Sequence, residues 1–262
     1  MAARHAGLTQ LGRAMAGVVC VAAMAKTAKS KAAVRTETIR PLRRLLRWLW
    51  RSVCLAIMLI LAAVAFYAVF NPPTTPYMLA ESRRLGGVER QWANLEDIAP
   101  VMARSAVAAE DANFCLHWGF DMAAIRAAIA GGGQRGASTI SQQVVKNAYL
   151  WQGRSWARKA LEAVITPVME AVWSKRRILE VYLNVVEFDE GVFGIEAAAQ
   201  RYFGVPARDL SAAQAARLAA VLPNPKARSA ANPTAAERRR AAAIRDGAAT
   251  IRADGRAACF ES

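Results

Sequence analysis

The longest apolar run of the chain covers residues 52–70, where 19 consecutive positions carry no charged side chain. A helix of about this length spans the roughly 30 Å hydrocarbon core of a bilayer. Trp48 and Trp50 precede the run and Tyr67 lies near its other end, as aromatic side chains do at membrane interfaces. An Asn-Pro-Pro sequence follows the run and ends the helix. The pattern predicts one N-terminal transmembrane helix.

After residue 91 the apolar positions recur mainly at the three- and four-residue intervals that are typical of helices. Only residues 185–188 suggest the alternation of a strand. The pattern predicts a mainly α domain over residues 92–228, after a linker at 71–91 and before an Arg- and Ala-rich helix and tail at 229–262. The predicted helices cover residues 95–110, 122–130, 140–150, 156–173, 175–183, 194–203, 212–222 and 233–252.

Charge separates the chain into two parts. The net charge is +15, and residues 1–51 carry eleven Lys and Arg against one Glu, a net +10. A basic arm can bind nucleic acid, but a basic segment directly before a membrane helix usually marks the cytoplasmic side of that helix. Residues 1–51 are therefore predicted to be a cytoplasmic arm, and everything after the helix to lie outside the cytoplasm.

The four cysteines leave one pairing to consider. Cys20 and Cys54 lie before or within the predicted membrane helix, so only Cys115 and Cys259 could meet in an oxidising compartment. Cys259 is close to the end of the chain, where the backbone is expected to fray, and this counts against a disulfide. The chain has no Cys-x-x-Cys sequence, so zinc or redox chemistry is not expected.

Two adjacent carboxylates, Glu110 and Asp111, end an apolar stretch. A carboxylate at the point where a helix gives way to a loop can face a cleft while its neighbours pack, which suits a general base. Spacing alone favours a solvated helix end with a capping Asp over a catalytic carboxylate.

A glycine-containing loop leads into a helix rich in hydroxyl and amide side chains at residues 136–147. Thr139 and Gln142 have the spacing of a capping box. The free N–H groups of such a helix start suit an anion, and Lys146 follows about two turns on. An ordinary capped helix with outward polar residues is the alternative.

Arg154, Arg158 and Glu162 are spaced by four and share one helical face. They form either a surface ion-pair ladder or a cationic group for a phosphate, with Glu162 as a second carboxylate. Two carboxylates can act as acid and base in glycoside chemistry. Cations are needed where a phosphate or diphosphate leaves. The set therefore points to glycosyl transfer from a lipid diphosphate rather than to hydrolysis.

From about residue 92 to 225 the chain resembles the monofunctional biosynthetic peptidoglycan glycosyltransferases of glycosyltransferase family 51, which are related to the polymerase domain of class A penicillin-binding proteins. The resemblance rests on five motifs in the family's order. They are Glu110-Asp111-x-x-Phe114-x-x-His117-x-Gly119-Phe120-Asp121; Gly136-Ala137-Ser138-Thr139-Ile140-Ser141-Gln142-Gln143 with Lys146-Asn147; Arg158-Lys159-x-x-Glu162; Lys175-x-x-Ile178-Leu179-Glu180-x-Tyr182-Leu183-Asn184; and Gly194-Ile195-Glu196-x-Ala198-Ala199 with Tyr202-Phe203-Gly204.

The resemblance implies a lysozyme-like helical domain with a mobile, membrane-facing flap. It implies a single-pass protein of the bacterial inner membrane with a periplasmic catalytic domain. The implied reaction polymerises lipid II with inversion, forms β-1,4 links and releases undecaprenyl diphosphate.

The resemblance also assigns roles by position. Glu110 is the base that takes the proton from the acceptor 4-hydroxyl, and Glu162 is the second essential carboxylate. The cations for the donor diphosphate are Lys146, Arg154 and Arg158. Residues that contact substrate or shape the site are Ser138, Thr139, Gln142, Gln143 and Asn147. Residues that brace the site are Asp111, Phe114, His117 and Lys159.

Some positions depart from the family pattern. Ala137 stands where a second Gly is common, and Leu161 stands where many members have a Lys, so no extra cation is expected there. The Arg-rich helix after residue 232 matches no motif. It is predicted either to be solvated or to contact anionic lipid headgroups.

The resemblance requires no cofactor, although Mg²⁺ or Mn²⁺ could bridge the diphosphate and Glu110. The expected partners are lipid II, the nascent glycan, membrane lipids and other cell-wall synthesis or division proteins, but no nucleic acid. Two alternatives remain. A lysozyme-like lytic enzyme would cleave the same glycan but leaves Lys146, Arg154 and Arg158 without a role. A non-catalytic scaffold of the division machinery leaves the whole polar set unexplained.

Overall fold

The computed structural model describes residues 43–132, 136, 138–153 and 155–261, in two units, Met1–Ile60 and Leu61–Ser262. The described part of the first unit is all helix, and this helix, Arg43–Tyr67, continues into the second unit. Within the described ranges it is the one helix long and apolar enough to cross a membrane, as predicted for the N-terminal part of the chain. It includes residues from Arg43 on, inside the segment predicted as the basic arm.

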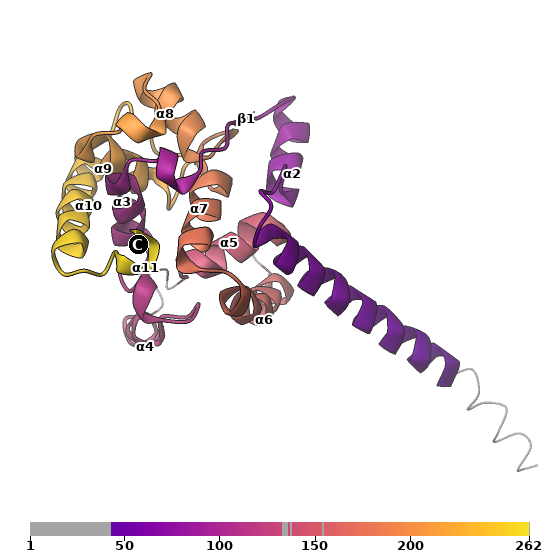
Figure 1. Ribbon diagram of the computed structural model, residues 1–262. Helices are drawn as coiled ribbons and strands as arrows, with labels where there is room; N and C mark the ends of the chain where they lie inside the picture. The colour runs from indigo at the N-terminus through magenta and orange to yellow at the C-terminus, as the bar shows by residue number, and fades with distance from the viewer. Residues whose placement is uncertain (1–42, 133–135, 137, 154, 262) are drawn as a thin grey trace, which may run out of the picture. The chain divides into compact units, whose positions relative to one another are not determined.

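The second unit is mainly α, as predicted, with one small sheet (Figure 1). Its helices are α2 (Pro76–Leu85), α3 (Pro100–Glu110), α4 (Met122–Ala130), α5 (Ile140–Tyr149), α6 (Trp156–Val172), α7 (Lys175–Val185), α8 (Ile195–Phe203), α9 (Ala212–Val221), α10 (Ala235–Ala253) and α11 (Ala258–Glu261), with 3₁₀ turns η1 (Leu95–Asp97), η2 (Phe114–Leu116) and η3 (Ala207–Asp209). The strands are β1 (Glu89–Arg90), β2 (Glu187–Asp189) and β3 (Val192–Phe193), in the order β1-β3-β2. β1 runs parallel and β2 antiparallel to β3.

Local sequence signals fix most helix starts. The capping box of Thr139 and Gln142 opens α5, and that of Ser211 and Gln214 opens α9. Each hydroxyl accepts a hydrogen bond from an N–H of the first helical turn that has no partner within the helix. The Asp121 side chain caps α4 in the same way.

Two predicted boundaries were wrong, and proline explains both. The helix predicted from residue 95 is interrupted, because residues 95–97 form η1 and α3 begins only at Pro100. The predicted linker contains α2, with Pro76 in its first turn and Thr75 as its cap. Proline ends helices in the interior but favours their first turn, since its missing N–H has no partner there in any case.

The core of this unit has α7 near its centre (Figure 1). α5 packs between α6 and α7, while α3, α9 and α10 pack against one another on the other side. The largest fully buried side chain is Tyr182 of α7. These two helix groups hold the two sides of the site described below.

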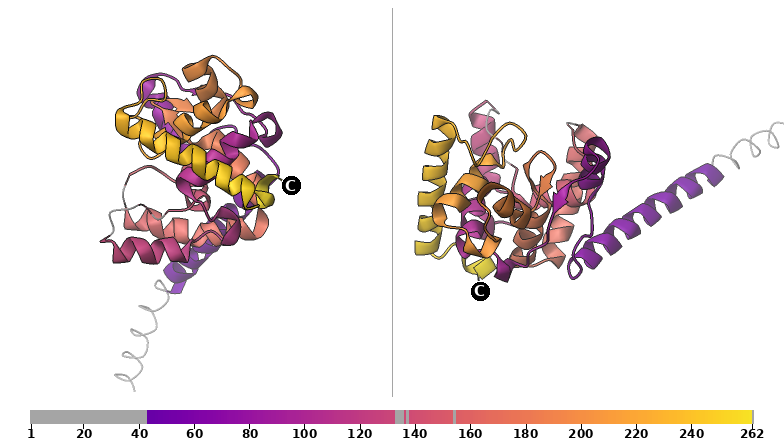
Figure 2. Two further views of the ribbon diagram at one scale, coloured as in Figure 1. Left: turned by 90° about the vertical axis from the view of Figure 1, so that its left-hand side faces the viewer. Right: turned by 90° about the horizontal axis from the view of Figure 1, so that it is seen from above.

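The Arg-rich C-terminal helix is part of the fold and not a solvated tail. α10 runs along α9 and α3 (Figure 2) and buries Ala241, Ile244, Ala248 and Ile251. A Cβ placed on Gly247 would lie 3.3 Å from the Ala108 Cβ of α3, so the two helices approach closely at this glycine. The sequence prediction missed this packing because arginine and alanine dominate the helix and hide its narrow apolar face.

Cys115 and Cys259 form a disulfide, with Cα atoms 5.7 Å apart. The predicted fraying near Cys259 was wrong, because the described residues up to Glu261 pack on the domain. Phe260 is 1% exposed, and Glu261 pairs with Arg104 at 2.7 Å.

Candidate active site

A cleft of about 790 Å³ lies where the end of α3 faces the starts of α5 and α6. Its walls hold most of the side chains that the sequence singled out, from motifs up to 52 residues apart. The lining residues are Ala109, Glu110, Gly136, Ser138, Gln142, Gln143, Lys146, Arg158, Lys159, Glu162, Leu222, Pro223 and Arg240. Arg154 lies outside the described residues.

Glu110 is the last residue of α3, and its side chain is 13% exposed. Its Oε2 accepts a hydrogen bond from Gln143 Nε2 at 3.0 Å, and its Oε1 lies 3.6 Å from Arg240 Nη2. Burial raises the pKa of Glu110, and the Gln143 hydrogen bond and the positive charges of Arg240 and Lys146 only partly oppose that rise. A half-buried carboxylate with a raised pKa and an open side toward a cleft is suited to proton transfer.

The cations gather around Glu162, on the opposite wall. The Glu162 side chain is 3% exposed, its Oε1 pairs with Arg158, and its Oε2 lies 2.8 Å from Lys159 Nζ. Lys159 Nζ also donates to Ser138 Oγ at 3.2 Å. Burial and the charge of Arg158 lower the pKa of Lys146, and the negative charges of Glu162 and Glu110 act in the opposite direction. A phosphate entering the cleft would meet these cations already arranged.

Asp111 connects the loop after α3 to the start of α5. One of its oxygens lies 2.8 Å from His117 Nε2, and the other accepts from the Ile140 N–H at 3.0 Å. Thr139, the cap of α5, donates to the Gly119 carbonyl at 2.6 Å. Since α5 carries Gln143 and Lys146, the loop and the cleft are mechanically coupled. Asp111 thus links His117 to the start of α5, and the bracing role that the resemblance gives to both residues stays a prediction.

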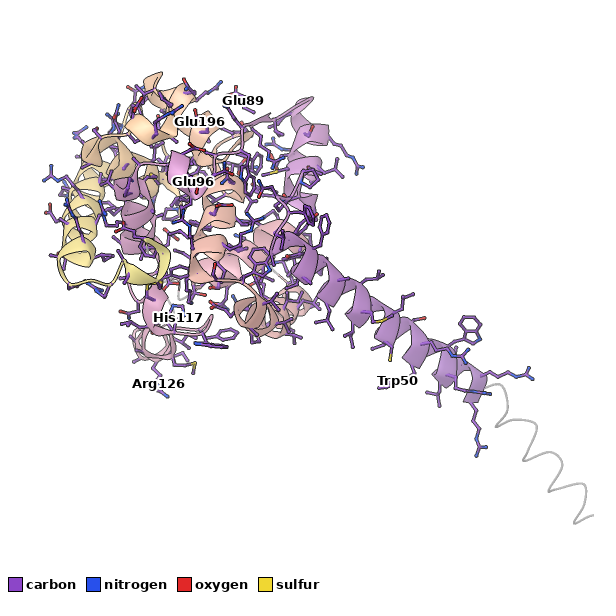
Figure 3. All side chains as sticks on the ribbon, in the orientation of Figure 1. Trp50, Glu89, Glu96, His117, Arg126 and Glu196 are labelled. Carbon is purple, nitrogen blue, oxygen red and sulfur yellow. A yellow bond between two sulfur atoms is a disulfide. The ribbon has the colours of Figure 1, made fainter. Side chains whose placement is uncertain are left out.

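Phe114 and His117 belong to the same loop, and His117 is labelled in Figure 3. Phe114 is fully buried, and Lys175 Nζ lies 4.5 Å from its ring centre, in the range of a cation–π contact.

Asn147 lines a small pocket beside the cleft, and Gln143 and Lys146 line the same pocket. Its Oδ1 accepts from Gln152 Nε2 at 3.1 Å.

Sequence reasoning missed two features of the site. Glu170 of α6 is buried and bonds to Ser141 Oγ and, at 2.8 Å, to Lys175 Nζ. Its signal was an acidic residue within an apolar helical stretch, which needs a buried partner. Arg240 carries no such signal, because Arg238 and Arg239 beside it look the same in sequence.

The described residues contain no group of three or more His, Cys, Asp and Glu side chains that could hold a metal ion. Glu110 and Glu162 already bind amide or cationic side chains. These side chains do not fit Mg²⁺ or Mn²⁺ unless the substrate supplies ligands of its own.

The family model and the relatives that match this chain point to the same protein family. A family model described as Transglycosylase matches residues 78–248, from within α2 to within α10. A biosynthetic peptidoglycan transglycosylase from Jannaschia sp. (strain CCS1) is 65% identical over 214 residues, which cover 82% of this chain and 90% of the relative. Proteins of the same name from Rhodospirillum centenum (strain ATCC 51521 / SW) and Caulobacter vibrioides (strain ATCC 19089 / CIP 103742 / CB 15) are 49% and 44% identical, covering 79% and 82% of this chain and 91% and 98% of the relatives. The chain therefore belongs to the transglycosylase family.

Proposed function

We propose that the protein is a peptidoglycan glycan-chain polymerase that uses lipid II. The observation that carries the proposal is the division of the cleft. A proton-accepting carboxylate lies on one wall, and a cationic group organised by a second carboxylate lies on the other. The names of the relatives support peptidoglycan synthesis as the setting.

In the proposed reaction Glu110 takes the proton from the 4-hydroxyl of the acceptor lipid II. The acceptor oxygen attacks C1 of the sugar at the end of the growing chain, from the face opposite the diphosphate. The C1–oxygen bond to the diphosphate breaks, so the new β-1,4 link forms with inversion. Undecaprenyl diphosphate leaves with the bonding electron pair, and Lys146 and Arg158 stabilise its added negative charge.

The surrounding residues have supporting roles in this scheme. Gln143 and Arg240 hold the Glu110 carboxylate from two directions. Glu162 keeps Arg158 and Lys159 in place, and Arg154 would extend the same cationic face. A diphosphate near Lys146 would counter the effect of burial and favour its charged form.

We place the protein in the inner membrane, with the N-terminus in the cytoplasm and the catalytic domain in the periplasm. The net +10 charge of residues 1–51 supports this orientation. Other partners in cell-wall synthesis or division, and contacts with membrane lipids, belong to the same proposal.

A lytic enzyme of lysozyme type is the second candidate function. Hydrolysis of a glycoside produces no diphosphate, so it would leave the cationic wall without a task. The geometry therefore favours transfer over hydrolysis.

The test is to incubate the purified full-length protein with labelled lipid II and separate the products by length. The proposal expects long glycan from the wild type and none from Glu110→Gln. The matched control is Glu96→Gln, because Glu96 (labelled in Figure 3) is 73% exposed on its side chain and does not line the cleft. Shortening of preformed glycan would support the lytic enzyme, and no change in either substrate would support a scaffold.

A further inference from the structure

We propose that the Cys115–Cys259 disulfide is a positioning element of the site, so that turnover depends on its oxidation. The bond holds the loop between α3 and α4 in the conformation that supports Glu110 and the start of α5. This inference rests on the proposed function for its activity readout.

The disulfide joins two segments that are far apart in sequence. Cys115 lies in η2, five residues after Glu110, and Cys259 lies in α11, 144 residues later. Arg256 Nη1 donates to the Ala112 carbonyl at 3.0 Å beside the bond. The Phe260 ring packs on Phe114, with ring centres 6.4 Å apart. The C-terminal segment is thus attached along the first turn of the loop.

The loop has little regular structure of its own. Between α3 and α4 the three residues of η2 are its only helical turn, so few repeated backbone hydrogen bonds fix it. Its conformation depends on specific contacts: Asp111 with His117, Lys175 Nζ with the His117 carbonyl at 2.7 Å, and the disulfide.

The loop position reaches the cleft through two contacts with the start of α5, one of which is the hydrogen bond from Thr139 Oγ1 to the Gly119 carbonyl. Asp111 also accepts from the Ile140 N–H at the start of α5. Gln143, one turn further along α5, holds the Glu110 carboxylate. A displaced loop would therefore shift both Glu110 and the amide that orients it.

Without the bond, α11 has weak means of staying in place. It spans four residues, too few to be stable as an isolated helix. The other contacts of this segment include the buried Phe260 ring, the Arg104–Glu261 ion pair, the Arg256 contact to the loop, the hydrogen bond from Arg176 to the Phe260 carbonyl at 3.3 Å and the packing of α11 on α7. We expect the reduced segment to open locally while the rest of the domain stays folded.

Both cysteines are half-buried, so a small reductant has access to the bond. With dithiothreitol, two electrons and two protons pass to the cystine. The protein gains two thiols, and the reagent closes to its cyclic disulfide.

The experiment compares three states of the full-length protein in detergent with labelled lipid II. They are the oxidised protein, the same protein after dithiothreitol, and the variant Cys115→Ser/Cys259→Ser. We expect kcat to fall by about tenfold or more on reduction, within the range that a small misplacement causes, with KM nearly unchanged. Reoxidation should restore kcat, and dithiothreitol should not affect the double variant.

Two controls separate positioning from general stabilisation. Cys54→Ser should respond to dithiothreitol like the wild type. Arg104→Ala removes another contact of α11 without touching the loop, so it should lower Tm but keep kcat. Hydrogen exchange should quicken at residues 112–119 on reduction while α5 and α7 stay protected.

An unchanged kcat in protein whose two thiols are shown to be free would overturn the inference. If the double variant does not fold, the reduced wild type, which starts folded, gives the answer. Turnover by Glu110→Gln would instead refute the proposed function and leave the redox comparison intact.

Discussion

Glu110 and Glu162 are two carboxylates that line one cleft, the first half-buried and the second buried, and their surroundings differ in kind. Glu110 has an amide at 3.0 Å and an arginine at 3.6 Å, and burial raises its pKa. Glu162 has a cation on each oxygen. The first can exchange a proton with a substrate, whereas the second is engaged in holding charge. In the proposed reaction the same type of side chain thus serves as a base on one wall and as a structural counter-ion on the other.

The largest expected effect on stability comes from Glu162→Gln. The change leaves Arg158 and Lys159 without their shared partner, and breaking a buried ion pair costs about 3–5 kcal/mol. Chemical denaturation of the full-length protein should show a loss of this size. A loss below about 1 kcal/mol, the usual value for an exposed pair, would contradict the assigned role.

The second largest loss of stability is expected at the close contact between Gly119, in the loop after α3, and Thr166 of α6. Gly119 has φ +83°, and a Cβ there would lie 2.5 Å from Thr166 Cγ2. Thr166 is fully buried and donates to the Glu162 carbonyl at 2.6 Å, so it has little room to move. Gly119→Ala should cost about 1–3 kcal/mol or more. Gly86→Ala is the matched control, since Gly86 has φ +80° with nothing within 4 Å of an added Cβ. An equal loss of stability in Gly86→Ala would show that backbone strain alone, and not the contact with Thr166, causes the loss in Gly119→Ala.

Arg240→Ala should change the pH dependence of activity through its effect on Glu110. The Arg240 charge lowers the pKa of Glu110, so its removal raises that pKa further. The base must be deprotonated to act, and the acidic limb of the kcat/KM profile should therefore move to higher pH. Arg239→Ala, an exposed neighbour on the same helix, should leave the limb in place. If the acidic limb of the kcat/KM profile stays in place in Arg240→Ala, Arg240 does not influence the protonation of Glu110 during turnover.

The smallest effect is expected for the stability of Glu110→Gln. Because the folded-state pKa of Glu110 is raised, its contribution to stability is fully present at low pH and is lost as pH rises through that pKa. A neutral amide does not titrate and so avoids this loss. The unfolding free energy of the variant should therefore rise relative to that of the wild type between acidic and neutral pH. The difference in unfolding free energy should stay within about 1 kcal/mol, the scale of one hydrogen bond.

How much of this could be predicted from the sequence depends on the range of each interaction. The caps of α5 and α9 were predicted because Thr139 and Ser211 act on residues three positions away. The contact of Arg240 with Glu110 was not predicted, since only the packing of α10 on α3 distinguishes Arg240 from Arg239. The disulfide joins residues 144 positions apart, beyond any local pattern. The motifs located the site, and tertiary packing assigned the partners within it.

The most direct test of the two roles is to measure lipid II affinity and turnover side by side for Glu110→Gln and Glu162→Gln. We expect Glu110→Gln to bind lipid II like the wild type but to make no glycan. We expect Glu162→Gln to bind lipid II more weakly, because its cations are no longer held. Retained turnover in Glu110→Gln, or unchanged lipid II affinity in a folded Glu162→Gln, would contradict the two proposed roles.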